Sequence, residues 1–215
     1  MVPIQCDADV GELRVAVAST SSEHSDEEGL SPLEREYLTR RSFGPARKSE
    51  WTAGRITARR ILARNGIHGG NILASENGAP RWIHPTQPLQ LSVSHDGPYV
   101  ALAWTKEPNA AVGVDVCLSS HQASLDRILR RFRITYEGCD SVSAWASLEC
   151  VIKIGGKRIG DVLDDPPRVV VQNDTAVVEL MGQEVSVHLR RHECFALAWG
   201  QRPRKAKKGA KAGEN

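Results

Sequence analysis

The tetrapeptide Ala-Leu-Ala-Trp occurs twice in this sequence, at residues 101–104 and 196–199. Each copy ends a pair of segments with strand character, the first around residues 92–95 and the second around residues 186–189. A helical segment precedes each pair. A supersecondary unit that recurs within one chain indicates an internal repeat. The sequence therefore predicts an α+β fold built from two similar halves that pack together.

Capping residues and apolar spacing place the individual elements. Ser31, Pro32 and Glu34 form the pattern of a capping box with proline in the first helical turn. Gly66 is the expected stop of the next helix. We expect helices at 31–41, 49–65, 125–132 and 141–154, and strands at 89–94, 99–104, 112–116, 168–172, 176–180, 184–189 and 194–199.

These elements divide the chain into an N-terminal α+β half at 1–108, a C-terminal α+β half at 109–200, and a tail at 201–215. The tail has no large apolar residue, so we expect it to be disordered. The chain has a net charge of +2, and the positive balance comes from the tail. Because the body has no basic, aromatic-rich motif, a nucleic-acid-binding function would rest on this tail alone and ranks last.

Composition excludes several classes of protein. Hydrophobic residues make up 40% and charged residues 25% of the chain, as in soluble globular proteins. Its apolar runs are too short to span a bilayer, and the N-terminal residues do not resemble a signal peptide. The five cysteines contain no C-x-x-C pair, so a zinc-knuckle site has no support. We expect a cytoplasmic protein with reduced thiols.

A carboxylate lies within the valine-rich segment at 112–117. In a strand, Asp115 and Cys117 would face one side, while Val114 and Val116 would face the other. A buried aspartate needs a partner, which could be a metal ion, a basic side chain or a backbone turn. The ordinary alternative is an aspartate that caps the turn after the strand.

Trp145, Glu149 and Lys153 are spaced four residues apart, so they form one stripe on a helix. An exposed Glu-to-Lys pair would be the ordinary interpretation of this spacing. The apolar neighbours Leu148 and Val151, however, indicate a helix buried over much of its circumference. A carboxylate and an amine at the edge of such a helix need partners.

A third segment, Ser-Val-Ser-His-Asp-Gly, carries His95 just before a turn. In this order, His95, Gly-Val-Asp-Val around Asp115, and Trp-x-x-x-Glu-x-x-x-Lys ending at Lys153 resemble the motifs of surfactin-type 4′-phosphopantetheinyl transferases. The stretch around Arg47 and the turn at 77–80 are also similar, and the resemblance extends from about residue 30 to residue 199.

This resemblance implies a pseudo-twofold fold and a defined reaction. The enzyme would transfer the 4′-phosphopantetheine arm of coenzyme A to a serine of an acyl or peptidyl carrier protein, releasing adenosine 3′,5′-bisphosphate. Asp115 and Glu149 match the Mg²⁺ ligands, and Mg²⁺ needs only one or two carboxylates when phosphates and water complete its shell. Asp115, Glu149 and Lys153 would be catalytic, with Glu149 as the family's candidate base for the acceptor serine.

The resemblance also implies how coenzyme A is held. Lys153 matches the lysine that contacts the pyrophosphate. Arg47 and His95 match residues that hold the 3′-phosphate, and Lys48 is a further candidate for coenzyme A binding.

The chain departs from the family pattern at three places. Cys117 replaces a frequent acidic residue, Leu148 replaces a usual lysine, and the segment at 118–144 is short. These departures motivate an alternative, in which a repurposed homologue keeps a coenzyme A or phosphopantetheine pocket but has a different or lost activity. In either case we expect a monomer.

Overall fold

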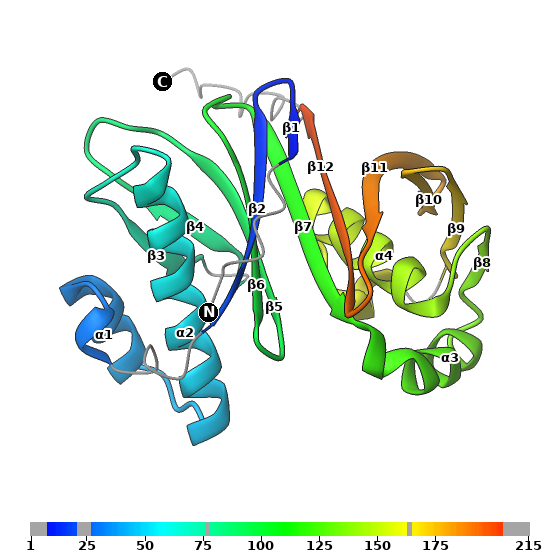
Figure 1. The fold of residues 1–215 in the computed structure, drawn as a ribbon, viewed down its shortest axis with the longest axis horizontal. Coiled ribbons are helices and arrows are strands. Elements are labelled where there is room, and N and C mark those ends of the chain that lie inside the picture. Colours follow the sequence, from blue (N-terminus) through cyan, green and yellow to red (C-terminus); the bar gives the residue numbers. More distant parts are fainter. Residues whose placement is uncertain (1–7, 21–26, 76–77, 163–164, 204–215) are drawn as a thin grey trace, which may run out of the picture.

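The computed structural model describes residues 8–20, 27–75, 78–162 and 165–203 (Figure 1). The helices in these ranges are α1 (Pro32–Thr39), α2 (Pro45–Arg64), α3 (Gln122–Arg131) and α4 (Ser141–Gly155), with short 3-10 helices η2 (Glu27–Gly29), η3 (Ser119–His121) and η4 (Ile159–Val162). The strands are β1 (Ala8–Val10), β2 (Leu13–Ser19), β3 (Asn71–Ala74), β4 (Pro80–Ile83), β5 (Gln90–Asp96), β6 (Tyr99–Thr105), β7 (Ala110–Leu118), β8 (Thr135–Glu137), β9 (Arg168–Gln172), β10 (Thr175–Leu180), β11 (Gln183–Arg191) and β12 (Phe195–Pro203).

Two sheets lie next to each other at the centre of the molecule, with a helix on the outer side of each (Figure 1). The four-stranded sheet has the order β1-β2-β6-β5 and is antiparallel throughout. The six-stranded sheet has the order β7-β12-β11-β10-β9-β8, and only β8 and β9 pair in parallel. The hairpin β3-β4 stands apart. The predicted mixture of helices and antiparallel sheets is therefore confirmed.

Apolar cores fill the three spaces between these layers. One core lies between α2 and the four-stranded sheet, one lies between the two sheets, and one lies between the six-stranded sheet and α4. The six-stranded sheet curls around α4, which contacts five of its strands (Figure 1). Burial of apolar surface in these cores supplies the main driving force for this arrangement.

Each of the two N-terminal helices begins at a proline, and a capping box also marks the start of α1. Ser31 Oγ accepts a hydrogen bond from the Glu34 N–H at 3.2 Å, and Glu34 Oε2 accepts one from the Ser31 N–H at 2.9 Å. The predicted capping box is thus confirmed. Helix α2 starts at Pro45, four residues before the expected start at 49, because proline suits the first helical position. This correction places Arg47 and Lys48 within the first turns of α2.

The two Ala-Leu-Ala-Trp copies lie on central strands, β6 and β12, but they present opposite faces. In β6, Leu102 and Trp104 belong to the core beneath α2. In β12, Leu197 and Trp199 belong to the core between the sheets. The two copies therefore do not occupy equivalent positions, and the pseudo-twofold relation stays a prediction.

The expected boundary between the halves, at residues 108 and 109, falls in the turn between β6 and β7. The core between the sheets takes residues from both sides of this boundary, and the division into halves stays a prediction. Strand β12 continues through Pro203, which pairs with Ala110, so it includes the first three residues assigned to the tail. The rest of the predicted tail, 204–215, lies outside the described residues.

Candidate functional site

The two sheets meet along a seam between their edge strands β5 and β7. Ser92 Oγ accepts a hydrogen bond from the Val114 N–H at 3.1 Å. Asp96 Oδ2 accepts one from the Leu118 N–H at 2.8 Å. Because side chains alternate along a strand, Ser92, Ser94 and Asp96 share one face of β5. The side chains on this face form hydrogen bonds with the edge of β7.

Asp115 lies at the middle of this seam and is only 6% exposed. Its Oδ1 accepts hydrogen bonds from Ser94 Oγ and from Lys153 Nζ, each at 2.7 Å. Lys153 Nζ also donates to the Val114 carbonyl oxygen at 3.0 Å. The aspartate of β7 and the lysine of α4 thus form a half-buried ion pair, which supplies the partner that the sequence required for Asp115.

Close contact between β7 and α4 makes this ion pair possible. Gly113 faces α4, and a Cβ atom at this position would lie 2.3 Å from the Cys150 carbonyl oxygen. Only glycine leaves enough room here. At the start of α4, Asp140 caps the helix by accepting a hydrogen bond from the Ser143 N–H at 2.7 Å and is held by Arg191 Nε at 2.9 Å.

The expected stripe on α4 is present. Within residues 141–154, every residue is buried except Trp145, Glu149 and Lys153, which are half-buried. Lys153 has Asp115 as its partner. The Glu149 carboxylate, in contrast, forms no hydrogen bond or ion pair with any described residue.

The environment of Glu149 is unfavourable for a lone negative charge. Burial raises the pKa of its carboxyl group, and the negative charge of Asp115 raises it further, although the Lys153 ammonium lowers it. A carboxylate in this setting gains from a cation nearby. Asp115 on β7 and Glu149 on α4, whose negative charges interact, are therefore suited to hold one.

These residues fit a Mg²⁺ ion on their chemistry. Both are hard oxygen donors, and the second oxygen of Asp115, Oδ2, accepts no hydrogen bond from the described residues. No group of three or more His, Cys, Asp or Glu side chains among the described residues is arranged to hold a metal. Water and phosphate oxygens would therefore have to complete the coordination, as Mg²⁺ usually requires.

Cys117 does not add a third ligand. It faces the α4 core and is 4% exposed. Burial raises the pKa of its thiol to about 12, and the charges of Asp115 and Asp96 contribute in the same direction. The thiol is neutral at physiological pH, and a neutral thiol is a poor ligand for Mg²⁺.

The remaining predicted residues are His95, on the other face of β5, and Arg47 and Lys48, in α2. His95 Nε2 is 3.4 Å from Glu50 Oε2, and Arg47 is 3.5 Å from the same oxygen. Glu50 thus brings Arg47 and His95 together. Lys48 forms a separate ion pair with Glu27 at 2.5 Å. The structure therefore separates the predicted site residues into a group around Asp115 and a group around Glu50.

Two residues that contact the predicted site were not predicted from the sequence. Ser94 contacts Asp115. The alternation of polar and apolar residues in β5 could have indicated that Ser94 lies on the same face as Ser92. Glu50 lies one helical turn after Arg47, and this spacing was its signal.

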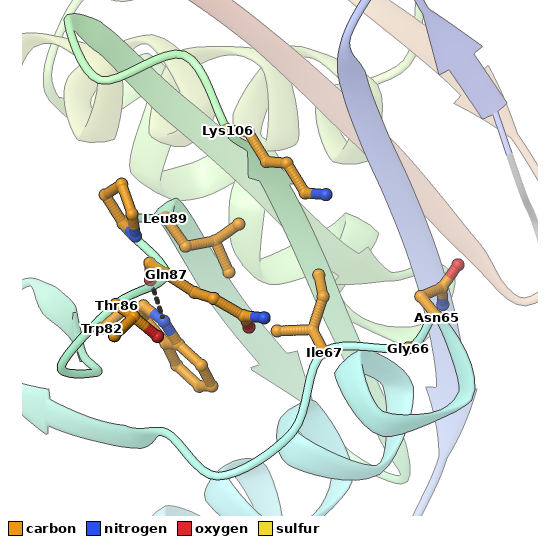
Figure 2. A pocket seen from close by; sticks show the side chains of 9 residues that line it. Asn65, Gly66, Ile67, Trp82, Thr86, Gln87, Leu89 and Lys106 are labelled. Atoms are coloured by element: carbon orange, nitrogen blue, oxygen red, sulfur yellow. Dashed lines mark hydrogen bonds between the residues drawn. The ribbon is translucent and has the colours of Figure 1, made fainter.

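A pocket of about 280 Å³ lies elsewhere, between the end of α2, the loop after β4 and the residue that follows β6 (Figure 2). Ile67, Trp82 and Leu89 form its apolar part, and Lys106 lies at its edge. The Trp82 indole N–H donates to the Gln87 carbonyl oxygen at 2.9 Å. None of the predicted site residues lines this pocket.

Comparison with known protein families identifies part of the chain. Residues 34–104 match the family model of the 4′-phosphopantetheinyl transferase N-terminal domain. These residues are therefore similar to that domain. This match supports the predicted relation to the 4′-phosphopantetheinyl transferase superfamily. A search of curated proteins gives no match.

The matched range contains the Glu50 group but ends before the Asp115 group. Arg47, Lys48 and His95 lie inside the matched range, whereas Asp115, Glu149 and Lys153 follow it. The seam between β5 and β7 joins the two groups.

Among the described residues, no helix is both long and apolar enough to cross a membrane.

Proposed function

We propose that the chain transfers the 4′-phosphopantetheine arm of coenzyme A to a serine of an acyl or peptidyl carrier protein, with Mg²⁺ as cofactor. One observation carries this proposal. Asp115 forms an ion pair with Lys153 and interacts with Glu149, and these residues follow a segment that matches the 4′-phosphopantetheinyl transferase N-terminal domain. A monomeric state and a cytoplasmic location stay predictions.

The three side chains match the needs of the reaction. Asp115 and Glu149 would hold Mg²⁺, and the positive charge of the ion would neutralise charge on the pyrophosphate. Lys153 is held at the site by Asp115 and the Val114 carbonyl, and it contacts the pyrophosphate as a point charge. Burial keeps these charges effective, because attraction between charges weakens in water.

Glu149 is the candidate base. The acceptor serine Oγ forms a bond to the β-phosphorus of coenzyme A as its proton passes to Glu149. The bond from the β-phosphorus to the bridging oxygen breaks, and adenosine 3′,5′-bisphosphate leaves. A positioned carboxylate within reach of the serine hydroxyl is an ordinary general base for such a step.

Arg47 and His95 are the candidates for the 3′-phosphate. Both lie next to the Glu50 carboxylate, so a bound phosphate would replace one anion by another. Arginine and histidine are suited to this exchange because their hydrogen bonds to an anion are charge-assisted. Lys48 would have to leave Glu27 to contribute.

A repurposed homologue remains the second candidate, and two observations favour it. Leu148, in place of the usual lysine, is completely buried in the α4 core, so its position supplies no charge to the site. Cys117 is buried and neutral in place of an acidic residue. Such a protein would bind coenzyme A through the same residues without transferring the phosphopantetheine arm.

Intact-mass spectrometry of carrier proteins tests the proposal. The full chain is incubated with coenzyme A, Mg²⁺ and several apo carrier proteins, with an established transferase as the positive control. We expect at least one carrier to gain a phosphopantetheine group. The transferase function is wrong if the control modifies the carriers and this chain modifies none, and coenzyme A binding in that case would favour the repurposed homologue.

A further inference from the structure

Ser94 makes a contact that its neighbours on β5 do not make. Ser92 and Asp96 bind backbone N–H groups of β7, at Val114 and Leu118. Ser94, between them, instead donates its hydroxyl hydrogen to the side chain of Asp115. A hydrogen bond with a charged acceptor is stronger than one between neutral groups. Ser94 therefore acts on the orientation of a carboxylate, whereas its neighbours join two strands.

The contact is enclosed on both sides. Ser94 is 6% exposed, and so is Asp115. Oδ1 of Asp115 receives two donors, Ser94 Oγ and Lys153 Nζ, while Oδ2 receives none from the described residues. The two donors approach from different elements, β5 and α4, and together they fix the rotation of the carboxylate. One oxygen is committed to the protein, and the other stays available to a cation.

We propose that Ser94 is a positioning residue that keeps Asp115 Oδ2 available for the cation of the site. This inference rests on the proposed function. Without the Ser94 hydroxyl, the carboxylate can rotate toward the Lys153 ammonium and use both oxygens in that ion pair. Asp115 would then be neutralised by Lys153 and would hold a divalent cation less well.

Ser92 provides a matched control. Ser92→Ala removes a hydroxyl from the same face of the same strand, and this hydroxyl also bonds to β7, but to the backbone. Both serines are buried, at 3% and 6% exposure. Ser92→Ala and Ser94→Ala should therefore lower the melting temperature by similar amounts. Only the second should change how the site responds to Mg²⁺.

Calorimetric titration of coenzyme A into the full chain, at a series of Mg²⁺ concentrations, tests the inference without any turnover. We expect Ser94→Ala to raise the Mg²⁺ concentration needed for half-maximal coenzyme A binding by roughly tenfold, as loss of a hydrogen bond to a charged group implies. Ser92→Ala should leave this concentration unchanged.

The two failures can be told apart. If wild type binds coenzyme A with Mg²⁺ and the Ser94 and Ser92 variants need the same Mg²⁺ concentration, the positioning role is overturned and the proposed function stands. If wild type binds no coenzyme A at any Mg²⁺ concentration, the proposed function is overturned, and the role of Ser94 goes with it.

Discussion

Glu149 is the residue on which the site depends most. It lies half-buried on a helix whose buried residues are apolar side chains and serines, and the charge of a second carboxylate, Asp115, acts on it. Lys153, one turn further on, is already paired with Asp115. The Glu149 carboxylate therefore adds nothing to the stability of the fold. Such an arrangement is typical of functional sites, which give up some stability for activity.

We predict that Glu149→Gln stabilises the metal-free protein. The pKa of Glu149 is raised in the folded state, so the fold favours the protonated form, and ionisation lowers stability as pH rises through this pKa. Glutamine resembles the neutral form at every pH. Above neutral pH in EDTA, the melting temperature should rise by about 2 °C, which at this size corresponds to about 1 kcal/mol or less.

Glu179, an exposed carboxylate on β10, supplies the control for this change. Glu179→Gln should leave the melting temperature nearly unchanged. A lower melting temperature for Glu149→Gln than for wild type would contradict the unfavourable charge that we assign to Glu149.

Glu50 offers a second prediction at the residue scale. Glu50→Gln removes the anion that pairs with Arg47 and His95. Both side chains then become free for a phosphate, so affinity for coenzyme A should rise by up to about fivefold, the usual range for exposed ion pairs. Affinity for dephospho-coenzyme A, which lacks the 3′-phosphate, should not change. Calorimetric titration with the two ligands measures the difference.

Glu36 on α1, which forms an exposed ion pair with Arg40 just after the helix, provides the control. Glu36→Gln should alter neither affinity. An equal gain for both ligands in the Glu50 variant would show that Arg47 and His95 do not bind the 3′-phosphate.

At the scale of elements, the contact of α4 with β7 determines the geometry of the site. Gly113 permits this contact, since a Cβ there would meet the backbone of Cys150 and the side chain of Ile154. The contact carries Lys153 to Asp115. A wider separation of strand and helix would weaken both the core and the ion pair.

We therefore predict that Gly113→Ala destabilises the protein by about 1–3 kcal/mol, as overpacked cores usually do. Gly54→Ala is the matched change, because a Cβ at this position in α2 has no atom within 4 Å. Alanine there should be neutral or stabilising by up to about 1 kcal/mol. Urea unfolding of both variants measures the difference, and equal stabilities would refute the close packing at Gly113.

The elements also show what could be predicted from the sequence. Helix α4 and its stripe were predicted because a period of four residues is visible within one segment. Strand β2 was missed, since the strand with which it pairs apart from β1 is β6, far along the chain. The contacts of Asp115 with Ser94 and of His95 with Glu50 join residues 21 and 45 positions apart, respectively. They depend on how two sheets and a helix meet, which local patterns do not encode.

At the scale of the whole molecule, the two sheets share one apolar core. Strands β2 and β6 contribute Val15, Val17 and Ala103, and strands β7 and β12 contribute Val114 and Leu197. The seam between β5 and β7 adds polar contacts to this core. Neither sheet could leave the other without exposing apolar surface.

We predict that the full chain unfolds in a single cooperative transition. Differential scanning calorimetry should give equal calorimetric and van't Hoff enthalpies, which is the test of two-state behaviour. Two resolved transitions, or a calorimetric enthalpy well above the van't Hoff value, would mean that the two sheets unfold independently. The core between them would then be too weak to hold the Asp115 group in place.

The most direct test of the account is the rate at which Glu149→Gln modifies a carrier protein that wild type modifies, measured by intact-mass spectrometry. Because the variant should fold at least as stably as wild type, a loss of activity will report on chemistry. We predict a rate at least about 100-fold below that of wild type, as removal of a general base implies. A rate close to that of wild type would contradict the assignment of Glu149, and with it the proposed site.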